Sequence, residues 1–167
     1  MESREAVSND VADLSTISSA LSRLLHGVYV LSTRRGRQLS AMTAAWVMQA
    51  SEHPPAVAVA VNRDNYTHDA ILESETFALS ILREDQVNVA AHFGTTSSEY
   101  DEKFAGIPYQ RTPNGSPVLL DCLAYLDCRL RNTAHIGSYT VFVGEVTAAE
   151  IMDETGSPLI YEASEYE

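Results

Sequence analysis

Apolar residues recur at every third or fourth position along residues 11–26, which is the spacing of one face of a helix. Asn9 or Asp10 can cap the start of this segment, and Gly27 can end it. The pattern predicts an amphipathic helix that docks on the rest of the domain. The charged and small residues before it, 1–10, predict a flexible N-terminus. The apolar positions are Leu14, Ile17, Leu21, Leu24 and Leu25.

A period of two, typical of strands, replaces the helical spacing after this segment. Residues 27–34 alternate, and the Arg34-Arg35-Gly36-Arg37 turn leads into a second strand, so a hairpin is expected. Residues 41–51 continue extended until the turn at His53-Pro54-Pro55. Residues 56–62 follow as a strand whose valines all face one way.

The second half of the chain predicts short helices between further strands. Helices are expected over residues 66–73, with Asn65 or Thr67 as cap, and over 84–93; residues 95–102 are polar and predict a mobile segment. The predicted strands are 76–82, 119–131, 139–149 and, closing a last hairpin, 159–161. Roughly seven strands and three short helices favour an antiparallel barrel with helical covers over a doubly wound sheet. Residues 11–167 are expected to form one domain.

The charge of the chain excludes two classes of partner. The formal net charge is -12, and no Lys or Arg follows Arg131, so nucleic acid and anionic membranes are disfavoured. No segment approaches the ~18 to 20 apolar residues of a membrane span, and we expect a cytoplasmic protein. Cys122 and Cys128 fall in the predicted strand 119–131. There their Cα atoms would lie ~20 Å apart, too far for a disulfide.

Several kinds of catalytic site are disfavoured by missing motifs. The sequence contains no Gly-x-Gly and no Gly-Lys, so a Rossmann fingerprint and a Walker loop are both missing. The five histidines are scattered and neither cysteine belongs to a Cys-x-x-Cys pair, which disfavours a metal site. Gly-x-Ser-x-Gly is also missing. An enzyme with this sequence would therefore depend on an organic cofactor.

Residues 39–67 carry the most informative pattern. The stretch from Ser40-Ala41-Met42-Thr43-Ala44-Ala45-Trp46 to Ala50, followed by residues 54–63, resembles the flavin reductase-like family of the FMN-binding split barrel. The resemblance extends through residues 77–82, 92–94, the Lys103-Phe104-Ala105-Gly106 segment and 142–146, in the family's order. Residues 46–50 are similar to the flavin reductase-like modules of flavodiiron proteins and to flavoredoxin-type proteins.

This resemblance implies a homodimeric flavoprotein with the split-barrel fold. FMN is the expected cofactor, with FAD as an alternative, and NAD(P)H is the expected donor of electrons. The acceptor would be free flavin, iron or a redox protein partner. Two other readings stay open: a flavin-binding electron carrier without a nicotinamide site of its own, and a flavin-free structural or regulatory dimer on the same fold.

The resemblance also implies the site residues. Small side chains at Ala41, Thr43, Ala44 and Ala45, together with Met42, would let backbone N–H groups approach the flavin ring. Without the resemblance, the two alanines at 44 and 45 would read as ordinary strand residues. Trp46 and Phe93 complete this part of the expected cofactor site, although a single tryptophan in a small chain is more often a core residue.

The ribityl chain and phosphate of the flavin are expected downstream. The resemblance places Asn62, Arg63, Asn65 and Thr67 around them, just before a helix whose N-terminus attracts anions. An N-capped surface turn is the alternative for these residues. Arg63 is the only Lys or Arg between Arg37 and Arg83, which makes it the expected phosphate ligand.

The residues expected near the nicotinamide, the electron donor, differ from the pattern of the family. Many reductases of the family carry Asp-His where this chain has Ser138-Tyr139, and that histidine is associated with the nicotinamide. Their Arg-rich Tyr motif is replaced here by Glu162-Ala163-Ser164-Glu165-Tyr166. Tyr139 is nevertheless the expected catalytic residue on the nicotinamide side. It could stack on a ring there, and packing in the sheet is the alternative.

Overall fold

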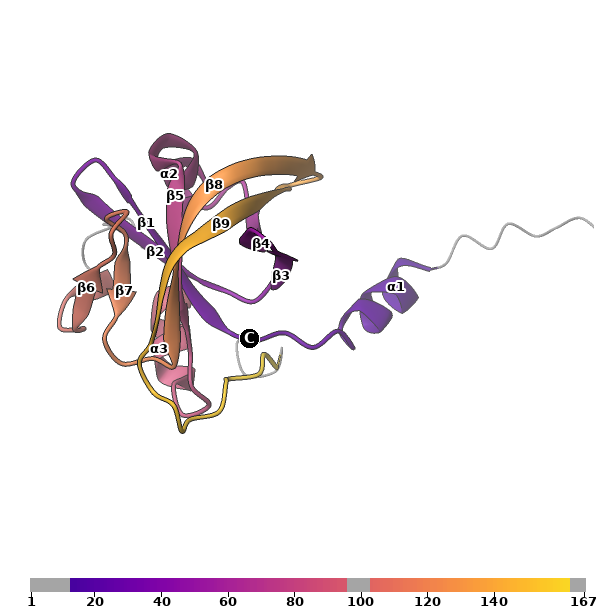
Figure 1. Ribbon diagram of the computed structural model, residues 1–167. Helices are drawn as coiled ribbons and strands as arrows, with labels where there is room; N and C mark the ends of the chain where they lie inside the picture. The colour runs from indigo at the N-terminus through magenta and orange to yellow at the C-terminus, as the bar shows by residue number, and fades with distance from the viewer. Residues whose placement is uncertain (1–12, 96–102, 163–167) are drawn as a thin grey trace, which may run out of the picture.

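The computed structural model describes residues 13–95 and 103–162. Its main feature is a seven-stranded sheet in the order β2-β1-β5-β8-β9-β4-β3, accompanied by a two-stranded sheet, β6-β7 (Figure 1). Every strand pair in this part of the chain is antiparallel, as predicted. The strands are β1 (Tyr29–Arg35), β2 (Gln38–Ala44), β3 (Val47–Glu52), β4 (Pro55–Asn62), β5 (Thr76–Ile81), β6 (Tyr109–Arg111), β7 (Pro117–Leu119), β8 (Ala124–Ile136) and β9 (Tyr139–Ile151).

The sheet must curl, because its two edge strands are consecutive in the sequence. β2 and β3 stand at opposite ends of the strand order, yet only Ala45 and Trp46 join them. Chain of that length spans at most about 11 Å, so the two edges come together at this link. The result is a barrel that stays open between the edges, with the link across the opening.

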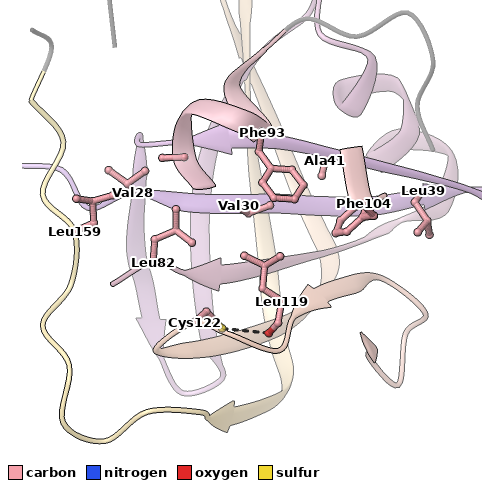
Figure 2. Packing of buried hydrophobic residues seen from close by; sticks show 11 residues of the cluster. Val28, Val30, Leu39, Ala41, Leu82, Phe93, Phe104, Leu119, Cys122 and Leu159 are labelled. Carbon is pink, nitrogen blue, oxygen red and sulfur yellow. Dashed lines mark hydrogen bonds between the residues drawn. The ribbon is translucent and has the colours of Figure 1, made fainter. Parts of the chain in front are cut away.

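Two hydrophobic clusters fill the space on either side of β1. Val28 and Val30 point into an outer cluster with Leu82, Phe93 and Phe104, which lies under helix α3 (Figure 2). Leu31 points the other way, into the barrel interior. The interior cluster consists of Leu31, Ala44, Val57, Val59, Val61, Ile71, Phe77, Leu79, Cys128 and Phe142. The aligned valines of β4 thus face the core, as their spacing predicts.

Two of the three helices cover the barrel. α2 (Tyr66–Ser74) packs on β1, β2 and β5, and its N-cap is Asn65, whose side chain accepts from the Thr67 N–H. α3 (Val87–Gly94) packs on β2 and β1 and begins three residues later than predicted. None of the helices in the described residues is long and apolar enough to cross a membrane.

The N-terminal helix differs from its prediction. α1 (Leu14–Leu21) is shorter, is capped by Asp13, and has no buried residue in the described chain. Leu14 is 81% exposed and Leu21 57% exposed, and Figure 1 shows the helix standing away from the sheet. The expected docking is therefore wrong for the described part of the chain, where the apolar face of α1 finds no partner to cover it. The expected caps and the flexible segment 1–10 lie outside the described residues.

Three strand boundaries also need correction. The predicted strand 41–51 is divided at Ala45 and Trp46 into β2 and β3. The predicted strand 119–131 is interrupted after β7, and Cys122 lies in the bend before β8. Residues 159–161 form no hairpin and make a single bridge, between Ile160 and Gly27. Extended local patterns predict these segments but do not show where tertiary contacts break them.

The two cysteines are free and buried in different clusters. The prediction that they do not bridge each other is confirmed, although they do not share one strand. Burial raises the pKa of the Cys122 thiol to about 11 and that of Cys128 to about 12, so both stay protonated near neutral pH. The predicted mobile segment 95–102 lies, apart from Thr95, outside the described residues.

Candidate functional site

A cavity of about 600 Å³ opens beside the link between β2 and β3. The described residues around it carry no formal charge and many are small, so planar apolar groups can approach the backbone closely. The end of β2, the link, β4, α3 and β9 all contribute to its wall. Its lining residues are Met42, Thr43, Ala44, Ala45, Trp46, Ala60, Asn62, Ala90, Ala91, Gly94, Thr95, Tyr139 and Tyr161.

A second cavity of about 470 Å³ adjoins the first and is more polar. Met42, Thr43, Asn62, Gly94 and Thr95 line both cavities, so they form one continuous trough. The N-terminal end of α2 forms one wall of the second cavity. The residues that belong to the second cavity alone are Ser40, Ala41, Asp64, Asn65, Tyr66, Thr67, Phe93 and Lys103.

Hydrogen bonds hold β2 and α3 together beneath the trough. The Thr43 hydroxyl donates to the Ala90 carbonyl over 2.5 Å. The Lys103 ammonium donates to the carbonyls of Ala41, at 3.0 Å, and Phe93, at 3.2 Å. These contacts satisfy polar groups beneath the trough and join β2 to α3.

Lys103 is the cation of the second cavity. Its side chain is partly buried, and desolvation lowers the pKa of the ammonium below its ordinary value. An anion bound in the cavity would offset part of the free-energy cost of desolvating the ammonium. The N-terminal residues of α2 add the positive end of a helix dipole. Asp64, which is exposed at the same cavity, opposes both with a negative charge.

An aromatic pair borders the first cavity. The ring of Tyr139 lies 5.0 Å from the ring of Trp46, tilted by 41°. Tyr139 begins β9, where it pairs with Asn62 of β4, and Trp46 belongs to the link. Trp46 is 49% exposed, so the pair forms part of the rim of the cavity rather than the core of the protein.

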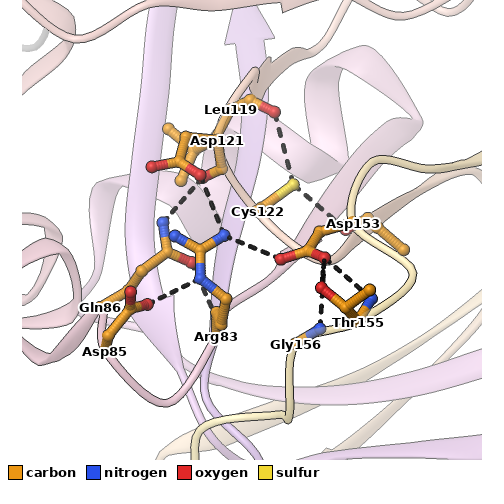
Figure 3. A network of polar contacts seen from close by, with 10 residues as sticks. Arg83, Asp85, Gln86, Leu119, Asp121, Cys122, Asp153, Thr155 and Gly156 are labelled. Carbon is orange, nitrogen blue, oxygen red and sulfur yellow. Dashed lines mark hydrogen bonds and ion pairs between the residues drawn. The ribbon is translucent and has the colours of Figure 1, made fainter.

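Tyr161 reaches the first cavity from the C-terminal segment. Its N–H donates to the His26 carbonyl, and the Leu159 N–H donates to Leu82. Arg83 holds the start of this segment (Figure 3). Its guanidinium contacts the carboxylates of Asp85, Asp121 and Asp153. Asp153 in turn accepts from the backbone N–H groups of Thr155 and Gly156. The carboxylates of Asp121 and Asp85 raise the pKa of the arginine, which stays charged. The network anchors the segment that carries Tyr161.

The structure brings together all but one of the residues that the sequence singles out. The predicted ring-side residues, from Ala41 to Trp46, line the trough, together with Asn62, Asn65, Thr67, Phe93 and Tyr139. Arg63 lines neither cavity. Its guanidinium instead donates to the Gly137 carbonyl, in the turn between β8 and β9.

Sequence reasoning missed several lining residues. Lys103 stands in the Lys-Phe-Ala-Gly segment that carries part of the resemblance, so a signal was present for it. Ser40 and Gly94 also stand in quoted segments. Tyr161 had no such signal, because only the path of the C-terminal segment brings it to the cavity. Among the described residues, no cluster of His, Cys, Asp and Glu could hold a metal ion.

Comparison with known proteins assigns the fold to a family. The family described as "Flavin reductase like domain" matches residues 21–167. The chain belongs to this family. Its open antiparallel barrel is the split barrel that the sequence predicted, and its trough lies in a flavin reductase-like domain.

The relatives of this flavin reductase-like domain include larger proteins. High molecular weight rubredoxin of Moorella thermoacetica is 35% identical over 86% of this chain and 63% of its own length. Diflavin flavoprotein A 1 of Synechocystis is 30% identical over 88% of this chain and 26% of its own length. The chain therefore spans less than two thirds of the length of these curated relatives.

A solved structure agrees with the same assignment. The NADH:FAD oxidoreductase SgcE6 of Streptomyces globisporus, in complex with NAD and FAD fragments, superposes with a TM-score of 0.80. It is 25% identical, and the match covers 89% of this flavin reductase-like domain and 88% of that chain. The arrangement of strands is thus shared over nearly the full length of both.

Proposed function

We propose that this domain binds a flavin, FMN in preference to FAD, and reduces it with NAD(P)H. The observation that carries the proposal is the two-part trough. Its first cavity is uncharged and lined by small side chains, while its second combines Lys103 with the N-terminus of α2. A flavin mononucleotide has the same two parts, a planar ring and a polar chain that ends in a phosphate.

The residues present fit that cofactor in their chemistry. Ala44, Ala45 and Ala60 leave room for a ring against the backbone of β2, the link and β4. Asn62 and the hydroxyls of the second cavity can bond the ribityl chain. We assign the phosphate to Lys103 and the N-terminus of α2, because Arg63 lines neither cavity.

A bound flavin would supply the redox chemistry, taking a hydride from a nicotinamide and passing electrons to an acceptor. The protein would supply orientation and a partly dehydrated environment. Tyr139 and Trp46 form the rim at which a nicotinamide would approach the first cavity. The flavoprotein relatives and the oxidoreductase solved with NAD and FAD fragments support this reading.

A second candidate is a flavin-binding electron carrier that another protein reduces. It is favoured by Tyr139 at the rim, where many reductases of the family carry the histidine associated with the nicotinamide. It is also favoured by the greater length of the relatives, such as high molecular weight rubredoxin. In both candidates the trough holds flavin, so they differ only in the source of electrons.

The test is reconstitution of the purified protein with FMN, followed by anaerobic addition of NADH and NADPH. A yellow protein bleached by either nucleotide supports the reductase, and a yellow protein that neither bleaches supports the electron carrier. A protein that takes up no flavin contradicts both candidates and supports the flavin-free dimer.

The position of the flavin is tested by Ala45→Leu. Ala45 is half-buried in the link and lines the first cavity, so the larger side chain would occupy the space of the ring. We expect at least a tenfold weaker FMN affinity in a fluorescence titration. Ala50→Leu, on the exposed surface of β3, is the matched control and should bind like the wild type. Ala44 is less suitable, because it packs in the interior cluster. Unchanged affinity in a folded Ala45→Leu protein would remove the link from the site.

A further inference from the structure

We propose that Arg63 is a positioning residue for the nicotinamide side of the site, acting through Tyr139. This inference rests on the proposed function, in which the rim formed by Tyr139 and Trp46 receives the nicotinamide. Arg63 directly follows Asn62, the last residue of β4. From there it reaches the turn that precedes Tyr139, rather than the cavity in which the phosphate would lie.

Arg63 holds this turn at two points. Its backbone N–H donates to the Ser138 carbonyl over 2.8 Å, and its guanidinium donates to the Gly137 carbonyl. The turn consists of these two residues, since Ile136 and Tyr139 are the last pair of β8 and β9. Gly137 has a φ of +54°, which other residues adopt at a cost. Both carbonyls of the tight turn are therefore fixed by one neighbouring residue.

Side-chain packing around the turn is sparse on the β8 side, although the backbone of Tyr139 pairs with Ile136 of β8 and with Asn62 of β4. At the end of β8, Ile136 is 72% exposed, and its neighbours in the strand are exposed as well. On the other side of Tyr139, Thr140 is fully buried, and its hydroxyl bonds the rings of His68, at 2.7 Å, and His135, at 2.9 Å. Tyr139 thus lies between the buried, hydrogen-bonded Thr140 and a turn whose two carbonyls both accept from Arg63.

The position of Tyr139 determines the shape of the rim. Its ring contacts Trp46, which is half exposed and belongs to the two-residue link. If the turn loosens, the Tyr139 ring loses its fixed approach to Trp46, and the opening beside Ala60 changes. Small displacements of groups that orient a reactant cost large factors in rate. Loss of the Arg63 contact should therefore affect nicotinamide more than flavin.

The experiment compares Arg63→Met, which keeps most of the unbranched apolar stem and removes the donors, with Arg63→Lys, which keeps a donor. The backbone bond to Ser138 stays in both. Arg37→Met, at the exposed tip of the β1–β2 hairpin, is the matched control for loss of one positive charge. The variants are measured by flavin titration, by anaerobic stopped-flow reduction with NADH, and by near-ultraviolet circular dichroism of the flavin-free protein.

The circular dichroism does not depend on activity. Trp46 is the only tryptophan of the chain, so its signal reports on the pair with Tyr139. We expect Arg63→Met to change this signal in the same direction as Tyr139→Ala, and Arg63→Lys to restore most of it. Arg37→Met should match the wild type.

The efficiency of flavin reduction by NADH should change in the same pattern as the circular dichroism. Arg63→Met should keep FMN affinity within about twofold and lower the efficiency of reduction by NADH by about tenfold. In a Tyr139→Ala background the same change should have no further effect, because the two residues act in series.

Two results would overturn the inference. A tenfold or greater loss of FMN affinity with riboflavin affinity unchanged would make Arg63 a phosphate ligand. Wild-type dichroism together with wild-type reduction would leave it no role at the rim. If the wild type binds no flavin, or binds it without being reduced by NADH, the proposed function fails. The dichroism of the flavin-free protein still decides whether Arg63 positions Tyr139.

Discussion

At the level of single residues, the contacts and the position of the Lys103 ammonium determine what this side chain can bind. It is the only lysine of the chain, and it links two carbonyls of the trough floor while its ammonium faces the second cavity. A charge-assisted hydrogen bond to phosphate contributes about 1.5–3 kcal/mol, whereas an exposed cation contributes little. In the proposed function, Lys103 therefore contributes to phosphate binding in a way that an exposed cation such as Arg37, at the tip of the β1–β2 hairpin, would not.

Lys103→Met should weaken FMN binding about ten- to a hundredfold and riboflavin binding much less, since riboflavin lacks the phosphate. Fluorescence titration with both flavins measures the difference. Asp64→Asn is the complementary variant: it removes the opposing carboxylate, so FMN should bind more tightly and riboflavin as before. Equal losses for the two flavins in Lys103→Met would mean that the lysine supports the floor and not the phosphate.

The pKa of Lys103 gives this prediction a pH dependence. Desolvation lowers that pKa, so the free protein loses this positive charge at a lower pH than an ordinary lysine would. FMN affinity should therefore fall as the pH rises through this value, while riboflavin affinity changes little. In Lys103→Arg, where the charge persists, the alkaline decline should disappear.

At the level of elements, the N-terminus of α2 has a structural role and, in the proposed function, a binding role as well. Asn65 caps the helix by accepting from the Thr67 N–H over 3.1 Å, and it also lines the second cavity. The Thr67 hydroxyl is within hydrogen-bonding distance of Ser40, at 2.8 Å, which ties the first turn of the helix to β2. The cap therefore fixes the wall from which the helix dipole acts on an anion.

Two substitutions at Asn65 should separate these roles. Asn65→Ala removes the cap and should lower the free energy of unfolding by about 1 kcal/mol, measured by urea denaturation. Asn65→Asp keeps a good cap, so its stability should stay within about 0.5 kcal/mol of the wild type. Its added negative charge in the cavity should nevertheless weaken FMN and leave riboflavin unaffected. If Asn65→Asp binds FMN like the wild type, the phosphate does not lie at this helix terminus.

The whole molecule carries a net charge of -12, which acts on any anionic ligand before contact. The attraction between an anion and the Lys103 side chain acts at short range, while the repulsion by the remaining negative surface acts at long range. The two effects respond differently to salt, because the Debye length falls from ~30 Å at 0.01 M to ~10 Å at 0.1 M. The predicted homodimer, which the monomeric structure does not test, would increase the repulsion.

The association rate of FMN should therefore rise with salt over this range, by roughly severalfold. Riboflavin has no phosphate, and its association rate should stay constant, which makes it the internal control. Stopped-flow quenching of flavin fluorescence measures both rates. An FMN association rate that falls with added salt would mean that a local positive field, and not the net charge, guides the cofactor.

The sequence by itself determined the kind of fold and the region of the site. The alternating residues of β1, β4 and β9, together with the tight turns from β1 to β2 and from β8 to β9, predict antiparallel pairing, because a period of two and tight turns are local properties. The small residues from Ala41 to Ala45 and the cap at Asn65 were likewise predicted where the trough lies. These features depend on neighbours in the chain and on few distant contacts.

Tertiary structure alone decided where long side chains and terminal segments go. Arg63 is adjacent to Asn62 in sequence, yet its guanidinium turns to Gly137 and leaves the cavity to Lys103, forty residues away. Tyr161 reaches the trough because Arg83 and a bridge at Gly27 hold the C-terminal segment there. The helix α1 has an amphipathic pattern but no buried face in the described chain. Flexible side chains and chain ends follow whichever distant partners the fold provides, and no local pattern encodes those partners.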